Sequence, residues 1–156
     1  MIFYFSATGN CKYVAQRIAA PTGEATISIA ECIKQKRFHF SSDNGTVGII
    51  TPTYAWGLPS IVRDFLNAFV LDEKPSYLWF LATYGTTSGQ TGRFANEIMQ
   101  EKGLSFSAYL SVKMPDTWTP TFDLSDPQKV RRINLNAEPE IDFAIEKIRS
   151  RSTGDY

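Results

Sequence analysis

Two short runs of this chain are apolar throughout, without the alternation of polar residues that a half-exposed strand shows. They are residues 47–50 and residues 77–82. Strands of this kind are typical of parallel sheets that are buried on both faces by helices. Segments with the period of an amphipathic helix separate these runs from three further strand-like runs. The sequence therefore predicts an α/β fold in which strands and helices alternate.

The expected elements follow one another over a chain of 156 residues, the size of one domain, so we expect a single domain over residues 1–156. We expect strands at 2–5, 25–29, 47–50, 77–82 and 104–113. We expect helices from 13 to the break at 21–23, then at 60–69, 91–102 and 126–151, the last broken near Pro139. Residues 32–44 are expected to be irregular, with His39 on the surface. Right-handed crossovers would place helices on both faces of the sheet.

The first strand runs into a loop of small and polar residues, which precedes a helix. Gly9 lets the backbone approach a ligand closely, and the first helical turn leaves N–H groups unpaired. These N–H groups and the helix dipole favour an anion without help from Lys or Arg. The loop is neither G-x-G-x-x-G nor G-x-x-x-x-G-K-[ST], so we predict a site for one phosphate monoester. Its residues are Ser6, Ala7, Thr8, Gly9, Asn10 and Cys11, of which Ser6, Thr8 and Asn10 offer side-chain donors.

Two further loops leave the carboxyl ends of predicted strands. One contains Pro52, Thr53, Tyr54, Ala55, Trp56 and Gly57, and the other contains Thr83, Tyr84, Gly85, Ser88 and Gly89. In the strand order 2-1-3-4-5, these loops and the first one converge on a single crevice. Flat aromatic rings in that crevice could stack on a planar ligand, or Tyr54 and Trp56 could instead cap the core.

The stretch Ser6 to Cys11 resembles the phosphate loop of the flavodoxin family, which reads roughly [ST]-x-T-G-N-T and grips the 5′-phosphate of FMN. Cys11 replaces its last Thr. The loop at 52–59 is similar to the family's second flavin loop, and Thr83 lies where the third begins. The resemblance implies a doubly wound, flavodoxin-like sheet of five parallel strands in the order 2-1-3-4-5. It also implies FMN as the cofactor, with its ring between Tyr54 or Trp56 and Tyr84.

The sequence also resembles the flavodoxin-like half of bacterial flavodoxin–ferredoxin fusion proteins, in residues 4–10 and 114–116. The family's role implies an electron-transfer protein that cycles flavin redox states between protein partners, ferredoxin-like proteins or a flavin reductase. A backbone carbonyl within Ala55 to Gly57 is expected to accept a hydrogen bond from the flavin N5–H group. Because the three loops hold no Asp or Glu, we expect weak repulsion of negative charge on the reduced ring.

Two other functions remain open. An FMN-dependent oxidoreductase acting on a quinone, a porphyrinogen or NAD(P)H would use Thr117, Trp118 and Phe122 as a lid. A flavodoxin-like domain without a cofactor would be a binding module, which the substitution at Cys11 motivates. The loops contain no pattern of base, nucleophile or metal ligands, so we expect no catalytic and no metal-binding residues.

Charge and composition exclude several classes of protein. Sixteen basic residues balance sixteen acidic ones, so no basic surface for nucleic acid is expected. Two cysteines are too few for an iron–sulfur cluster. No apolar run is long enough to span a membrane, and Met1 leads directly into a strand, so we expect a cytoplasmic protein. We expect a monomer or a weak dimer.

Overall fold

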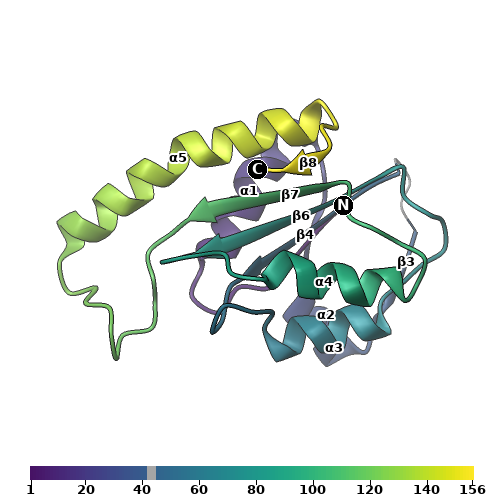
Figure 1. Cartoon of the computed structure of the whole chain (residues 1–156), viewed down its shortest axis with the longest axis horizontal. Coiled ribbons are helices and arrows are strands. Elements are labelled where there is room, and N and C mark those ends of the chain that lie inside the picture. Colours follow the sequence, from purple (N-terminus) through teal and green to yellow (C-terminus); the bar gives the residue numbers. More distant parts are fainter. Residues whose placement is uncertain (42–44) are drawn as a thin grey trace.

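The computed structural model describes residues 1–41 and 45–156, and it contains a central parallel sheet between two layers of helices (Figure 1). In spatial order the strands of this sheet are β2 (Thr26–Ser28), β1 (Ile2–Tyr4), β4 (Thr46–Pro52), β6 (Tyr77–Tyr84), β7 (Ala108–Lys113) and β8 (Gly154–Asp155). The first five strands have the predicted order 2-1-3-4-5, so the doubly wound α/β fold is confirmed. The sixth strand, β8, was not predicted.

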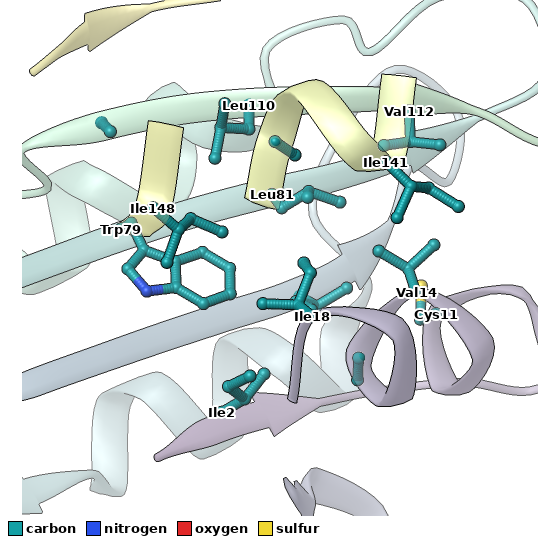
Figure 2. Packing of buried hydrophobic residues seen from close by; sticks show 14 of the residues in the cluster. Ile2, Cys11, Val14, Ile18, Trp79, Leu81, Leu110, Val112, Ile141 and Ile148 are labelled. Carbon is teal, nitrogen blue, oxygen red and sulfur yellow. The ribbon is translucent and has the colours of Figure 1, made fainter. Parts of the chain in front are cut away.

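Helices cover both faces of the sheet, as expected (Figure 1). One face carries α1 (Asn10–Thr22) and α5 (Pro127–Arg149), and the other carries α2 (Ile29–Gln35), α3 (Ser60–Ala68) and α4 (Thr91–Gln100). Figure 2 shows Val14 and Ile18 of α1 and Ile141 of α5 pointing toward the strand residues Leu81 and Val112. All five side chains are buried, so this layer is held by apolar packing.

The opposite face is packed mainly by phenylalanine rings. Phe3 of β1 lies with its ring centroid 4.7 Å from Phe40, 5.5 Å from Phe65 and 5.1 Å from Phe69. Edge-to-face and tilted contacts of this kind add to the burial of large apolar area. The two apolar runs that opened the sequence analysis form the middle of the sheet, β4 and β6, and are buried on both faces.

Close packing explains the glycine in the middle of β4. A Cβ atom on Gly48 would lie 2.1 Å from a ring atom of Trp79, which sits on the neighbouring strand. Only glycine leaves room for that indole, and Trp79 is 1% exposed as a result.

The expected irregular segment at 32–44 was wrong for residues 32–35 and 39–40. Residues 29–35 form helix α2, and β3 (His39–Phe40) follows it, while residues 42–44 lie outside the described part of the chain. The Ser28 side chain accepts a hydrogen bond from the backbone N–H of Glu31 at 3.4 Å. Ser-x-x-Glu is a helix-capping pattern, so the start of α2 was readable from the sequence. His39 is exposed, as predicted.

Other differences lie at short or terminal elements. Strand β3 pairs with β5 (Val70–Leu71) in a separate two-stranded sheet that was not predicted. β7 begins at Ala108 rather than at residue 104. Two-residue strands have no periodicity to read, and long-range pairing creates them. β8, for example, is held by hydrogen bonds such as the one from the Gly154 N–H to the Ser107 carbonyl at 3.0 Å.

Helix α5 continues through Pro139, so the expected break was wrong. A proline in a helix costs one backbone hydrogen bond. The helix on its carboxyl side buries Ile141, Ala144 and Ile148 against the sheet, and this packing holds the helix together across Pro139.

Candidate functional site

A cavity of about 850 Å³ opens at the carboxyl edge of the sheet. Its walls are the segments that follow β1, β4, β6 and β7. Small-molecule sites usually measure about 300 to 1,000 Å³, and in open α/β sheets they lie at this edge. The lining residues are Ser6, Ala7, Thr8, Asn10, Cys11, Pro52, Thr53, Tyr54, Ala55, Trp56, Thr83, Tyr84, Gly85, Thr86, Thr87, Met114, Pro115, Asp116, Thr117, Trp118, Thr121 and Phe122.

The amino terminus of α1 forms one end of this cavity. Its N-cap is Gly9, which has φ 109° and no side chain to offer to the first turn. The Gly9 N–H itself donates to Ser6 Oγ at 3.1 Å, which closes the loop into a tight turn. The N–H groups of the first helical turn therefore remain available to an anion.

A segment from a fourth strand end crosses the cavity, and we call residues 114–123 the strap. It is tied to the first loop, because Asn10 Nδ2 donates to the Pro115 carbonyl at 3.0 Å. Thr8 Oγ1 also donates to Thr117 Oγ1, at 3.4 Å. The side chains of Thr8 and Asn10, expected to face an anion, thus also hold the strap.

The loop after β4 forms a tight turn with strained backbone. The Tyr54 and Gly57 backbones exchange hydrogen bonds of 3.0 and 2.9 Å, and the two residues between them, Ala55 and Trp56, have φ values of 46° and 61°. Positive φ at both central positions defines a type I′ turn, which normally needs Gly, Asn or Asp. Strain of about 1 to 3 kcal/mol per such residue is typical of ligand sites.

This turn is locked to the loop after β6. The Gln90 N–H donates to the Trp56 carbonyl at 2.9 Å. A Cβ atom on Gly89 would lie 2.4 Å from that same carbonyl oxygen, so only glycine permits the approach. The carbonyls of Tyr54, Trp56 and Gly57 each accept a backbone hydrogen bond. In the described part of the chain, the Ala55 carbonyl of this turn accepts none. Positive φ lies at Ala55 and Trp56 rather than at the neighbouring Gly57.

Aromatic rings stand around the mouth of the cavity. Trp56 is 69% exposed and Trp118 is 64% exposed, while Tyr54 is 46% exposed. Exposed apolar groups that gather in one place are typical of ligand or partner sites, and these three rings all line the cavity. Burial raises the pKa of Tyr54 and the pKa of Tyr84, so both phenols stay neutral near pH 7.

Cys11 lies at the inner wall, where it is 1% exposed. Its Sγ is 3.1 Å from Thr83 Oγ1. Burial raises the pKa of the Cys11 thiol to about 12, against the weaker opposing effect of this hydrogen bond. A neutral, enclosed thiol is a poor nucleophile, so Cys11 acts here as a small spacer under the loop.

The structure brings all three predicted loops to one cavity. Trp56 and Tyr84 both line it. Four of the predicted site residues do not line the cavity and instead shape the backbone around it, namely Gly9, Gly57, Ser88 and Gly89. The predicted cofactor site left out Thr86, Thr87 and the strap, whose residues Thr117, Trp118 and Phe122 were expected only as the lid of the alternative enzyme. The available signal was its position, because the strap follows the carboxyl end of a strand just as the three predicted loops do.

Comparison with known proteins agrees with this geometry. The family model described as a flavodoxin domain matches residues 1–142. The chain belongs to the flavodoxin family. No curated protein sequence matches it. In the described part of the chain, none of the helices has the length and hydrophobicity that crossing a membrane requires.

Solved structures similar to this flavodoxin-family chain share its fold. A putative flavoprotein from Bacteroides uniformis has a TM-score of 0.56 at 14% identity, with 72% of this chain and 88% of that chain covered. The two-electron reduced flavodoxin of Megasphaera elsdenii has a TM-score of 0.50 at 16% identity, with 71% and 85% covered. The rubredoxin oxygen:oxidoreductase of Desulfovibrio gigas has a TM-score of 0.53 at 17% identity, and this chain spans 36% of its length while 96% of this chain is covered.

Proposed function

We propose that this chain, acting as one domain, binds FMN in the cavity and transfers electrons between protein partners, such as a ferredoxin-like protein and a flavin reductase. When bound, FMN would supply the redox chemistry. The observation that carries the proposal is the meeting of two features in one cavity. These features are the uncapped amino terminus of α1 and the aromatic turn at 54–57.

The phosphate would lie at the first turn of α1. The backbone N–H groups there, together with the Ser6 hydroxyl, suit a dianionic ester without a cationic side chain. Because Asn10 and Thr8 each hold the strap, we assign most of the phosphate's hydrogen bonds to the backbone. The replacement of a hydroxyl by the buried Cys11 thiol then removes little from the site.

The ring would lie between the loops that carry Trp56 and Tyr84. Their aromatic faces, with Tyr54, would stack on a planar ring and exclude water from it. The Ala55 carbonyl is the acceptor that the turn leaves for the N5–H group of a reduced flavin, because the Trp56 carbonyl accepts from Gln90. The strained turn at Ala55 and Trp56 fixes this carbonyl in place.

A comparison of FMN with riboflavin tests the proposal. The two share the ring, but riboflavin lacks the phosphate, so a site built around α1 distinguishes them. We expect apoprotein to bind FMN at least about 100-fold more tightly, because two charge-assisted hydrogen bonds contribute about 1.5 to 3 kcal/mol each. Quenching of flavin fluorescence measures both affinities. Equal affinities, or no quenching by either flavin, would contradict the proposal.

A second candidate is an FMN-dependent oxidoreductase, and the strap favours it. Trp118, Thr117 and Phe122 line the cavity as the lid of such an enzyme would. Steady oxidation of NAD(P)H with a quinone by the purified, FMN-loaded protein would establish the enzyme. Reduction only through a partner reductase, with a long-wavelength absorbance band during stepwise reduction, would establish the carrier.

A further inference from the structure

One acidic residue of the strap faces the cavity in a fixed position. A Cβ atom on Gly85 would lie 2.3 Å from both Cβ and Oδ2 of Asp116, so the aspartate side chain rests directly on the backbone of Gly85. Its other oxygen, Oδ1, accepts the backbone N–H of Trp118 at 3.0 Å. The carboxylate is therefore held from two sides at the carboxyl end of β6.

The strap is fastened on both sides of this residue. The Met114 N–H donates to the Tyr84 carbonyl at 2.9 Å, and Pro115 accepts the bond from Asn10. Thr117 is bonded to Thr8. Three residues within two positions of Asp116 are thus tied to two of the loops that form the cavity, which leaves its carboxylate little freedom to turn away.

Asp116 also differs in charge from the other residues of the lining. Among the described residues that line the cavity, it is the one with a formally charged side chain. The other acidic groups in the lining stay neutral near pH 7, because burial raises the pKa of Cys11 to about 12 and raises those of Tyr54 and Tyr84. Glu140 lies behind Tyr84, where it raises the tyrosine's pKa further and accepts the Lys113 N–H at 2.7 Å.

We propose that Asp116 sets the charge that a bound flavin can carry and thereby lowers the potential at which the flavin accepts its second electron. This inference depends on the proposed function, since it assumes that FMN occupies the cavity. It also revises the expectation of weak repulsion, which was drawn from the three loops alone. The strap supplies the carboxylate that those loops lack.

The electrostatic argument follows from the electron and proton balance. After one electron and one proton the ring is neutral. A second electron without a proton leaves one negative charge on the ring, whereas a second electron with a proton leaves it neutral. A fixed carboxylate in the same cavity raises the cost of the first outcome and favours uptake of the proton.

The test compares two substitutions that remove the same charge from the same strap. Asp116→Asn removes the carboxylate that lines the cavity. The control, Asp123→Asn, removes a carboxylate of an exposed residue that does not line the cavity. The FMN-loaded proteins are reduced stepwise with dithionite in the presence of reference dyes. We expect Asp116→Asn to raise the equilibrium constant for the second electron about tenfold, equal to about 59 mV, and Asp123→Asn to change it less than about twofold.

Two further measurements separate charge from structure. In the wild type, a proton is taken up with the second electron below a certain pH. This limiting pH should be lower in Asp116→Asn, because the carboxylate that favours proton uptake is gone. Gly85→Ala keeps the charge, but its methyl group displaces the Asp116 carboxylate from the backbone of residue 85. The potential for the second electron should therefore also rise, by a smaller amount than in Asp116→Asn. This variant also keeps the test informative if Asp116→Asn fails to fold.

The outcomes distinguish this inference from the function on which it rests. If the wild-type apoprotein quenches no FMN fluorescence, the proposed function is wrong. If it binds FMN but Asp116→Asn, Gly85→Ala and Asp123→Asn all keep the wild-type potential and pH profile, the role of Asp116 is wrong and FMN binding stands.

Discussion

The two edges of the central sheet are formed by the same strands but are completed in different ways. At the amino edge, side chains close the ends of the strands. The Met1 amino group pairs with Glu24 and donates to the Thr46 carbonyl at 2.9 Å. The Tyr77 hydroxyl donates to the Ser152 carbonyl at 2.8 Å, next to β8. The Met1 amino group and the Tyr77 hydroxyl thus find their partners within the chain.

At the carboxyl edge the chain leaves groups for another molecule. The first turn of α1 has no side-chain cap, Trp56 and Trp118 are exposed, and two non-glycine residues are held at positive φ. Backbone strain and clustered exposed rings of this kind are typical of ligand sites. The difference indicates that one edge stabilises the fold while the other is prepared for a ligand.

The two ends of α1 give the strongest test of this difference. Gly9 and Gly23 flank the helix, both have positive φ, and a Cβ atom on either would meet nothing within 4 Å. We expect Gly9→Ala to weaken FMN binding about a thousandfold, since the displaced loop loses charge-assisted hydrogen bonds worth about 4 kcal/mol together. Gly23→Ala should leave FMN affinity unchanged and lower the free energy of unfolding by about 1 kcal/mol. Fluorescence titration and urea unfolding measure these effects, and equal losses of affinity would refute the comparison.

Alkaline pH should lower the free energy of unfolding through one buried group at each edge. The pKa of Cys11 at the carboxyl edge is raised by burial from 9.0 to about 12, and that of Tyr77 at the amino edge, also mainly by burial, from 10.0 to about 12. The unfolded chain loses these protons first, so stability is complete below pH 9 and falls between pH 9 and 12. Cys11 should account for roughly 1 kcal/mol per pH unit there. Urea unfolding at several pH values should show a shallower loss in Cys11→Ala, and an unchanged slope would contradict the assignment.

Removing an exposed ring should affect FMN affinity at the carboxyl edge but not at the amino edge. Trp56→Ala removes a ring from the cavity mouth, and we expect about tenfold weaker FMN binding, because stacking on an aromatic side chain contributes about 1 to 3 kcal/mol. Tyr156→Ala removes a ring near the amino edge, which packs on Phe143 at 5.9 Å between centroids. This control should leave FMN affinity unchanged. A matching loss in both variants would mean that the exposed rings serve the fold rather than the ligand.

Much of this molecule was readable from the sequence because its signals are local or periodic. The wholly apolar runs of β4 and β6 predicted the centre of the sheet, and the glycine-containing loops were predicted to meet at its carboxyl edge. Periodicity and strand direction together were enough to bring Ser6, Trp56 and Tyr84 to one cavity.

The rest depends on contacts between distant segments. Asp116 lies 31 residues after Gly85, and no pattern in either segment predicts that one rests on the other. The type I′ turn at Ala55 and Trp56 contradicts local preference, since neither residue favours positive φ. It is imposed by Gln90 and Gly89, which meet Trp56 only in the folded chain.

The smallest expected effect comes from one substitution made at both ends of a single strand. Tyr77 begins β6 and Tyr84 ends it. Tyr77→Phe removes the donor to the Ser152 carbonyl from a side chain that is 2% exposed, so we expect a loss of about 1 kcal/mol in the free energy of unfolding. Tyr84 is half-buried, and water can replace its hydroxyl contacts, so Tyr84→Phe should cost less than half of that. Neither change removes a ring, so FMN affinity should stay within about twofold in both. Urea unfolding measures the difference, and a larger loss at Tyr84 would mean that the carboxyl edge contributes to stability as strongly as the amino edge does.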